Sequence, residues 1–425
     1  MKRTYDIRLV ITVFIFIAIV GAAVASCYIK GKRQGDFKVY YSASLAYREG
    51  LNPYDMDNLS TALHVPVLTP YVYPPDTLFI FRPLTFFTFQ TAARLYLTVK
   101  LLAVCALIFF WCHIFDFKQY TPVLLLVSPL AFNGSLLDDL GAGNVSIFEQ
   151  FFIWAGFYFY ARDKIVWFAV AIILASTFKF TPIVLLGILA TRLQRRDLVC
   201  LGCAGISFLL ILAVNALIWP QMFAQFFHNV STIRGERGDG NPAILALASD
   251  TVTWLRMKTG YLLPGIVPTG IYIVSSLTVL YVAALTFIKL RSLDEKKANL
   301  WRICLICFVY ALILPRLKNY SYIVLIAPSI YAVISRPLAS AWVPFCGLFL
   351  IYTYREFNVL GSALSPLYRV QCEYYSLIIA WVVAGLFCYS FLRRSQSSTD
   401  ENADASKGEG TESIGKSFPT AQTRS

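Results

Sequence analysis

Charged side chains are scarce in this chain of 425 residues, and those present stand in short clusters. Only 14% of the residues are charged, while 57% are hydrophobic. A soluble domain carries about 25% charged residues. The composition therefore excludes a water-soluble protein and predicts an integral membrane protein.

The apolar segments also lack the alternation of apolar and polar residues that a transmembrane β-barrel shows over about 10 residues. They are continuous over about 17–25 residues, long enough to cross the hydrocarbon core as helices. No A-x-A-like cleavage site follows the first of them, so we expect it to be retained. The runs lie at 9–29, 91–113, 120–136, 145–161, 165–191, 198–219, 264–288, 299–315, 319–335, 338–354 and 374–392. The predicted fold class is an all-α polytopic membrane protein with about 10–12 transmembrane helices.

Metal-ligating residues are few and dispersed. The three histidines, His64, His113 and His228, are far apart, and neither C-x-x-C pair, at 200–203 or 304–307, has a histidine nearby. We interpret the cysteines as small apolar residues packed in helices. No cofactor is predicted, although the sequence leaves a divalent cation open, and no nucleic-acid partner is expected.

Lysine and arginine clusters between the runs predict the topology, because short basic loops stay in the cytoplasm. The run 165–191 has such clusters at both ends, and Pro182 disfavours helix near its centre. Lys179, beside this proline, is costly in lipid. We therefore predict two short helices, 165–178 and 182–191, forming a re-entrant-like hairpin with an outward tip. The clusters that then lie inside are Lys2/Arg3/Arg8, Lys118, Arg162/Lys164, Arg192/Arg195/Arg196, Lys289/Arg291/Lys296/Lys297/Arg302, Arg336 and Arg393/Arg394.

This topology predicts one membrane domain over residues 1–394 with both termini in the cytoplasm. Its outward segments are 30–90, 137–144, 178–182, 220–263, 316–318 and 355–373, of which 30–90 and 220–263 are long loops. Residues 395–425 are rich in Ser, Thr, Asp, Glu and Gly, so we predict a disordered cytoplasmic tail.

The first outer loop carries the densest set of polar and aromatic residues. From Phe37 to Arg48 apolar residues recur at helical spacing, and Gly50 with Asn52 and Pro53 ends the pattern. We predict a short amphipathic helix in the membrane interface. Asp36, at its start, is either an N-cap or a functional carboxylate held by the helix N-terminus, and the two roles are compatible.

Three motifs in this loop resemble the opening signature of glycosyltransferase family 87. They are Gly35-Asp36-Phe37-Lys38-Val39-Tyr40-Tyr41, Asn52-Pro53-Tyr54-Asp55 and Tyr71-Val72-Tyr73-Pro74-Pro75. Gly143-Asn144 resembles the family's G-Q-x-N region without the glutamine, and Phe178-Lys179-x-Thr181-Pro182 resembles its K-x-x-P segment. Pro315-Arg316 with Asn319-Tyr320 resembles its S-P-R-x-x-x-Y segment, with Leu314 in place of the serine.

The resemblance implies a C-type (GT-C) glycosyltransferase fold and an active site on the outer face of the cytoplasmic membrane. The family includes mannosyltransferases that use polyprenol-phosphate mannose, so the expected partners are a polyprenyl-phosphate sugar, a glycan or glycolipid acceptor and the lipid bilayer. An acidic residue early in the first outer loop serves as general base in the family, and Asp36 is the matching position.

The predicted topology brings further candidate site residues to the same face. Lys179, Arg316 and Lys318 are the cations expected to stabilise the departing phosphate, with interfacial snorkelling as the alternative for Arg316 and Lys318. The candidates for acceptor or sugar binding are Tyr40, Tyr41, Asn52, Tyr54, Asp55, Tyr73, Asp138, Asp139 and Asn144. Plain solvated loop acids are the alternative for Asp138 and Asp139.

Two other functions fit a multi-pass protein. A transporter or flippase of lipid-linked sugars would place ionisable groups at mid-helix and often show two similar halves. We see no internal repeat, and Lys100 and Glu149 are the nearest cases of ionisable residues within a run. A non-catalytic membrane scaffold is the third hypothesis, and the presence of the Asp36 motif argues against it.

Overall fold

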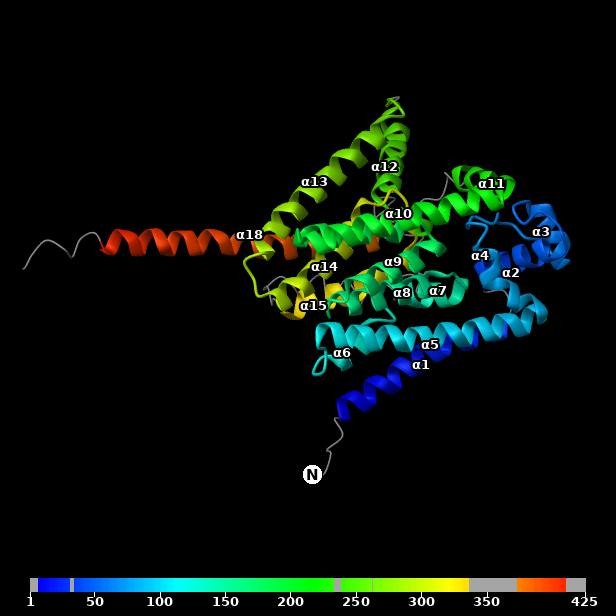
Figure 1. Ribbon diagram of the computed structural model, residues 1–425, viewed down its shortest axis with the longest axis horizontal. Helices are drawn as coiled ribbons and strands as arrows, with labels where there is room; N and C mark the ends of the chain where they lie inside the picture. Colours follow the sequence, from blue (N-terminus) through cyan, green and yellow to red (C-terminus); the bar gives the residue numbers. More distant parts are fainter. Residues whose placement is uncertain (1–6, 31–33, 233–237, 262, 336–372, 410–425) are drawn as a thin grey trace, which may run out of the picture.

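The structure is a computed structural model that describes residues 7–30, 34–232, 238–261, 263–335 and 373–409. Every regular element in these ranges is a helix (Figure 1). Five of the described helices are long and apolar enough to cross a membrane. They are α1 (Ile7–Lys30), α5 (Phe89–Phe115), α10 (Arg195–Ile218), α13 (Val267–Leu290) and α18 (Tyr375–Glu409). The prediction of an all-α polytopic membrane protein is confirmed.

The other apolar runs form helices that are shorter or bent. They are α6 (Thr121–Val127), α7 (Ala131–Ala142), α8 (Ser146–Tyr160), α14 (Glu295–Ile313), the 3₁₀-helix η4 (Asn319–Leu325) and α15 (Ile326–Ser335). The α6–α7 pair is bent by 66°. If this pair is counted as one span, the described ranges contain six membrane-spanning segments. The sequence predicted more, about 10–12 transmembrane helices. Positive φ angles at residues 132–134 accompany the bend. The predicted run 338–354, Arg336 and most of segment 355–373 lie outside the described residues.

The predicted hairpin is present. Helix α9 (Ile165–Phe178) ends at Lys179, whose backbone is extended, and the 3₁₀-helix η2 (Thr181–Arg192) follows. Pro182 lies in the first turn of η2, where its missing N–H leaves no hydrogen bond unmade. Arg192 Nη1 lies 2.9 Å from Oδ1 of Asp163, just before α9. The chain thus returns to its starting end, which confirms the split inferred from the two basic clusters.

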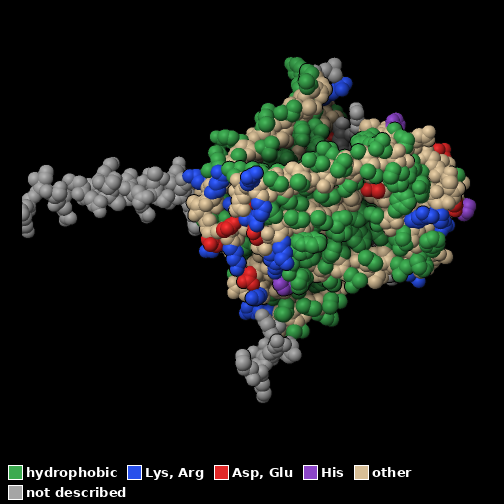
Figure 2. Space-filling view, viewed as in Figure 1, with side chains coloured by type: hydrophobic (Ala, Val, Ile, Leu, Met, Phe, Trp, Pro, Cys, Tyr) green, Lys and Arg blue, Asp and Glu red, His purple; other side chains and the backbone are tan. Residues whose placement is uncertain are grey.

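The connections sort into two groups at opposite ends of the bundle. The α5–α6 and α13–α14 connections lie at the left end in Figure 1, and α2–α4 lie at the right. The hairpin base, residues 162–165 and 192–196, belongs to the left end, where Arg192 Nη2 lies 2.9 Å from Oε1 of Glu295. Figure 2 shows lysine and arginine gathered mainly at this end, with an apolar band across the middle of the face. The charge pattern predicted that the short basic connections would lie together at one end of the bundle.

The first long loop folds into a compact region with its own hydrophobic core. It contains α2 (Gly35–Arg48), α3 (Met56–Leu63), α4 (Thr77–Phe81) and the 3₁₀-helix η1 (Arg82–Phe86). Residues 39–46 of α2 are all buried, so the prediction of an amphipathic helix in the interface needs correction. The helix exists, but its small serine and alanine side chains let neighbouring segments close over the second face. Ser44 Oγ, for example, donates to the carbonyl of Leu78 at 3.1 Å.

The second long loop and the tail also contain helix. Helix α11 (Pro220–Thr232), the 3₁₀-helix η3 (Gly238–Gly240) and α12 (Ile244–Thr259) lie within 220–263. In the tail, α18 continues to Glu409, and the disorder expected from residue 395 stays a prediction. Extending a formed helix avoids the cost of nucleation, so a polar sequence can continue one that it would not start. Residues 410–425 lie outside the described ranges.

Candidate active site

Gly143 brings the first turn of α2 against the end of α7. Its φ of +71° ends α7 in the left-handed conformation, which glycine adopts without strain. A Cβ at this position would lie 2.9 Å from Cβ of Phe37 and 3.0 Å from Cβ of Gln34. The backbone N–H of Gln34 donates to the carbonyl of Gly141 at 2.8 Å. A glycine is therefore what places Asp36 beside Asn144.

Asn144 is the centre of a cluster of polar side chains that includes Asp36, Tyr40 and Tyr320. Its Oδ1 accepts hydrogen bonds from the backbone N–H of Ser146 at 3.1 Å and from Ser146 Oγ at 3.0 Å. These two bonds assign the orientation of the side-chain amide. Its Nδ2 then lies 2.6 Å from Oδ2 of Asp36, and 3.0 Å from the hydroxyls of both Tyr40 and Tyr320. One amide thus joins segments more than a hundred residues apart in sequence.

Asp36 lies in the first turn of α2 and is half-buried. The N-cap position belongs to Gln34, and no side chain caps this helix. The N-cap interpretation of Asp36 is therefore wrong, although the helix N-terminus still favours its negative charge. Among the described residues, hydrogen bonds reach only Oδ2, which leaves Oδ1 for a bound molecule.

Tyr40 and Tyr73 place a pair of hydroxyls beside this carboxylate. The two oxygens are 2.7 Å apart, and Asn144 Nδ2 lies 3.4 Å from that of Tyr73. Burial raises the pKa of the Tyr40 hydroxyl well above its ordinary value, and the neighbouring Tyr73 and Asp36 raise it further. Burial and the charge of Asp36 likewise raise the pKa of Tyr73. Both groups therefore stay protonated and act as hydrogen-bond donors.

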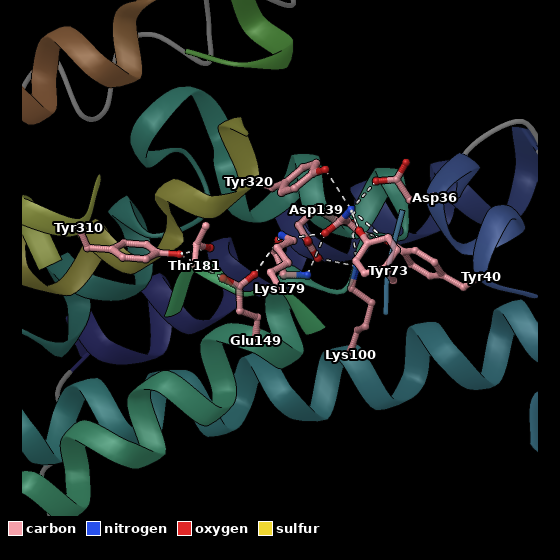
Figure 3. Close-up of polar contacts among 12 residues, drawn as sticks. Asp36, Tyr40, Tyr73, Lys100, Asp139, Glu149, Lys179, Thr181, Tyr310 and Tyr320 are labelled. Carbon is pink, nitrogen blue, oxygen red and sulfur yellow. Dashed lines mark hydrogen bonds and ion pairs between the residues drawn. The ribbon is translucent and has the colours of Figure 1, made fainter. Parts of the chain in front are cut away.

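Lys179, at the tip of the hairpin, reaches the same cluster from the other side. Its Nζ lies 2.9 Å from Oε2 of Glu149 and donates a hydrogen bond to Ser146 Oγ. The side chain of Lys179 is 22% exposed, whereas that of Glu149 is fully buried. The ammonium also lies 5.1 Å from the ring centre of Tyr320. Ser146 and Asn144 therefore link a partly accessible cation to Asp36. Figure 3 shows Lys179, Glu149 and Asp36 in this one group of polar contacts.

Glu149 is a site residue that the sequence reasoning did not select. Its Oε1 accepts from the hydroxyl of Tyr310 at 3.4 Å, and that hydroxyl lies 3.0 Å from Thr181 Oγ1. Its position within an apolar run could have indicated a functional role, because an ionisable residue there needs a partner and often marks a functional site. What the sequence did not indicate was that the partner would be Lys179.

Asp138 and Asp139 lie in the last turns of α7 rather than in the loop predicted at 137–144. Asp139 Oδ1 lies 2.5 Å from Nζ of Lys100, and both side chains are fully buried. This corrects the prediction that Asp139 contacts acceptor hydroxyls, since the ion pair encloses its carboxylate. Asp138 is half-buried and accepts from Nδ2 of Asn319 at 3.3 Å.

Four other predicted binding residues build the loop region instead of joining the cluster around Asn144. The Tyr41 hydroxyl donates to the carbonyl of Phe87 at 2.8 Å. Asn52 Oδ1 accepts from the backbone N–H of Tyr54 at 3.1 Å, and the Tyr54 hydroxyl donates to the carbonyl of Tyr73 at 2.7 Å. Asp55 caps α3 by accepting from a backbone N–H at 3.0 Å. Tyr54 therefore supports the site indirectly, by holding Tyr73.

Arg316 and Lys318 lie in the connection from α14 to η4, and both are half-buried. Lys318 Nζ is 5.9 Å from the ring centre of Tyr320, the tyrosine that also faces Lys179. The backbone N–H of Leu317 donates to Oδ1 of Asn241 at 2.8 Å, which anchors the connection. Within the described ranges, no group of three or more His, Cys, Asp or Glu side chains is placed to hold a metal ion.

The helices and this cluster together define a polytopic membrane protein with a polar site at one end of its bundle. The model of glycosyltransferase family 87 matches residues 71–315, more than half of the chain, and the chain belongs to this family. It is therefore a membrane glycosyltransferase, which acts on a sugar donor and an acceptor, and nothing supports the transporter alternative. A search of curated proteins finds no match. The matched residues include Asn144, Glu149 and Lys179, while Asp36 precedes them.

Proposed function

We propose that this glycosyltransferase transfers a hexose, mannose, from a polyprenyl-phosphate sugar to a glycan or glycolipid acceptor, with inversion at the anomeric carbon. Family membership supports the reaction class, and the early motifs support the donor. One observation carries the assignment of the site: Asp36 and Lys179 are connected through only two side chains, those of Asn144 and Ser146. A base and a phosphate-binding cation are the two groups that this reaction needs.

Asp36 is the general base in this proposal. It accepts the proton of the acceptor hydroxyl while that oxygen attacks the anomeric carbon, and the bond from this carbon to the phosphate oxygen breaks on the opposite face. The hydrogen bond from Asn144 to Oδ2 holds the carboxylate in place. The protonated hydroxyls of Tyr40 and Tyr73, 2.7 Å apart, are suited to hold sugar or acceptor hydroxyls nearby.

Lys179 stabilises the departing phosphate, with Arg316 and Lys318 as further cations. The phosphate leaves with the electron pair of the broken bond, so it gains negative charge that a fixed cation stabilises. A phosphate is already a good leaving group, and a strong protein acid is not required. The partial exposure of Lys179, with the buried Glu149 behind it, supports contact with a lipid phosphate at the membrane edge.

We further propose that the site faces outward from the cytoplasmic membrane, with both chain termini inside. Single cysteines, placed in a background without other accessible thiols, should be labelled from outside at accessible positions of the hairpin tip and of segment 30–75, such as 179, 49, 57 and 68. Position 195 should be labelled only from the cytoplasmic side. Labelling of position 179 only from the cytoplasm would reverse the orientation and remove the phosphate role of Lys179.

The reaction itself is tested with purified protein and defined polyprenyl-phosphate sugars. We expect polyprenyl phosphate to be released from the mannose donor when an acceptor glycan is present. Release from a different sugar donor would change the sugar assignment alone. Movement of intact lipid-linked sugar across a vesicle membrane, without release, would favour the flippase alternative instead.

A further inference from the structure

A groove runs along the outer surface of the bundle between α9 and α10. Its volume is about 690 Å³. Apolar and small side chains form most of its walls, among them Ile165, Ala169 and Ile173 of α9 and Val199, Cys203 and Ala204 of α10. Arg195 and Arg196 lie at one end. The groove is therefore apolar along its length and cationic where it meets the hairpin base.

Two of the three arginines at this end already pair with carboxylates of the protein. Arg196 Nη2 lies 2.7 Å from Oδ1 of Asp163, and Arg192 Nε lies 3.1 Å from Oδ2 of Asp197. Both carboxylates already have arginine partners. Arg195 is exposed and, among the described residues, makes no ion pair. The open end of the groove thus offers a guanidinium to an anion from outside the chain.

We propose that this groove binds one bilayer phospholipid with an anionic headgroup. The headgroup phosphate pairs with Arg195, and one acyl chain lies between α9 and α10. The stretch of α10 from Arg195 to Ser207 that lines the groove is about 18 Å long, a length that suits an acyl chain. Guanidinium groups bind phosphate oxygens in a bidentate way, and neighbouring anionic lipids favour basic residues at the membrane surface.

The position of the groove separates this lipid from the proposed sugar donor. Its cationic end is at the hairpin base, whereas Lys179 is at the tip, the length of α9 away, about 21 Å. A lipid wedged between α9 and α10 stabilises the hairpin that carries Lys179. Its binding is nevertheless independent of the proposed reaction, so it can be measured without any sugar transfer.

The test measures lipid retention by the purified full-length protein in detergent, using native mass spectrometry with phosphatidylglycerol or phosphatidylcholine added. We expect one phosphatidylglycerol to be held more tightly than phosphatidylcholine. Arg195→Gln should weaken phosphatidylglycerol binding about fivefold, the effect of one basic residue near an anionic surface. Cys203→Trp should reduce binding of both lipids, because Cys203 is exposed within the groove and the indole fills it.

Lys118→Gln is the matched control. It removes one positive charge from an exposed side chain outside the groove, so phosphatidylglycerol binding should not change. Equal losses in Lys118→Gln and Arg195→Gln would show a general charge effect and overturn the proposal. Retention of the lipid preference in Arg195→Gln would also overturn it. Displacement of phosphatidylglycerol by polyprenyl phosphate at lower concentration would reassign the groove to the donor lipid.

Discussion

The ion pairs at the two ends of the α9–η2 hairpin differ in how exposed the cation is and in how many carboxylates surround it. At the base, Arg192 is only 4% exposed and lies within 3.1 Å of three carboxylates, those of Asp163, Asp197 and Glu295. At the tip, Lys179 is 22% exposed and meets one carboxylate, that of Glu149. The base cation is surrounded by its own counter-charges, whereas the tip cation keeps an accessible side. We interpret the first as structural and the second as able to bind a ligand.

The largest difference between the two ends should appear in donor binding. Lys179→Ala removes a charge-assisted contact worth about 1.5–3 kcal/mol, so the Kd for the polyprenyl-phosphate sugar should rise about 10- to 100-fold. Lys179→Arg keeps the charge and should be milder. Arg192→Gln should lower the melting temperature yet leave this Kd unchanged. Equilibrium binding of the donor measures all three variants.

Loss of binding in Lys179→Ala has to be separated from misfolding, because the variant leaves Glu149 buried without its cation. The double variant Lys179→Met/Glu149→Gln removes both charges, and such replacements are often neutral for stability. It should unfold at a temperature near that of the wild type and bind donor as weakly as Lys179→Ala. Donor binding at wild-type strength in either variant would remove Lys179 from the site.

Gly143 tests whether the meeting of α2 and α7 matters for the site. Gly143→Ala forces a left-handed conformation on alanine and a contact with Phe37 that is too short, which together should cost about 1–3 kcal/mol. Turnover should fall with stability, since Asp36 is displaced from Asn144. Gly141→Ala is the matched control, because nothing lies within 4 Å of its added Cβ. Gly143→Ala should therefore have a lower unfolding temperature and a lower turnover than Gly141→Ala. Equal values for the two variants would argue against the close contact between α2 and α7 at Gly143.

The smallest effect is expected at the hairpin base and depends on pH. Hydrogen bonding from Arg196 is the main cause that lowers the pKa of Asp163 in the folded protein. Because the pKa is lowered in the folded protein, charged Asp163 stabilises the fold at any pH above the pKa of the unfolded chain, about 3.9. This contribution is lost as the pH falls from that value through the pKa of the folded protein. Because Asp163 is 52% exposed, the contribution is at most about 1 kcal/mol.

Asp163→Asn is a suitable variant, because asparagine also tolerates the positive φ found there. Its stability should be slightly lower than that of the wild type at pH 6, and the gap should close below about pH 4. Unfolding temperatures across this pH range measure the gap. A gap that stays constant down to pH 3 would show that the charge of Asp163 is not its cause.

The hairpin was predictable because its signals are local. Pro182 and the two flanking basic clusters lie within one stretch of sequence, and each has a direct structural consequence. The pairing of Lys179 with Glu149, and of Lys100 with Asp139, is not encoded locally, since each pair joins different helices. Sequence indicated that these charges need partners but not which partners they take.

The burial of α2 shows a second limit of the sequence pattern. Ser42 and Ser44 are polar and in the sequence each looks suited to contact with water, but both are buried and bond to backbone carbonyls. Small hydroxyl side chains fit a surface against water and a tight packing contact equally well. Only the tertiary structure distinguishes the two, and it does so here by placing α4 and η1 against the helix.

The most direct test of the account is the turnover of Asp36→Asn. Asparagine keeps the size of the side chain and an oxygen that accepts the hydrogen bond from Asn144, but it cannot take a proton as a base. The variant should fold and bind donor nearly normally, yet release polyprenyl phosphate at least about a hundredfold more slowly. Asp55→Asn, at an N-cap that asparagine fills as well as aspartate, should turn over like the wild type. Near-normal turnover of Asp36→Asn would contradict the assignment of Asp36 as the general base.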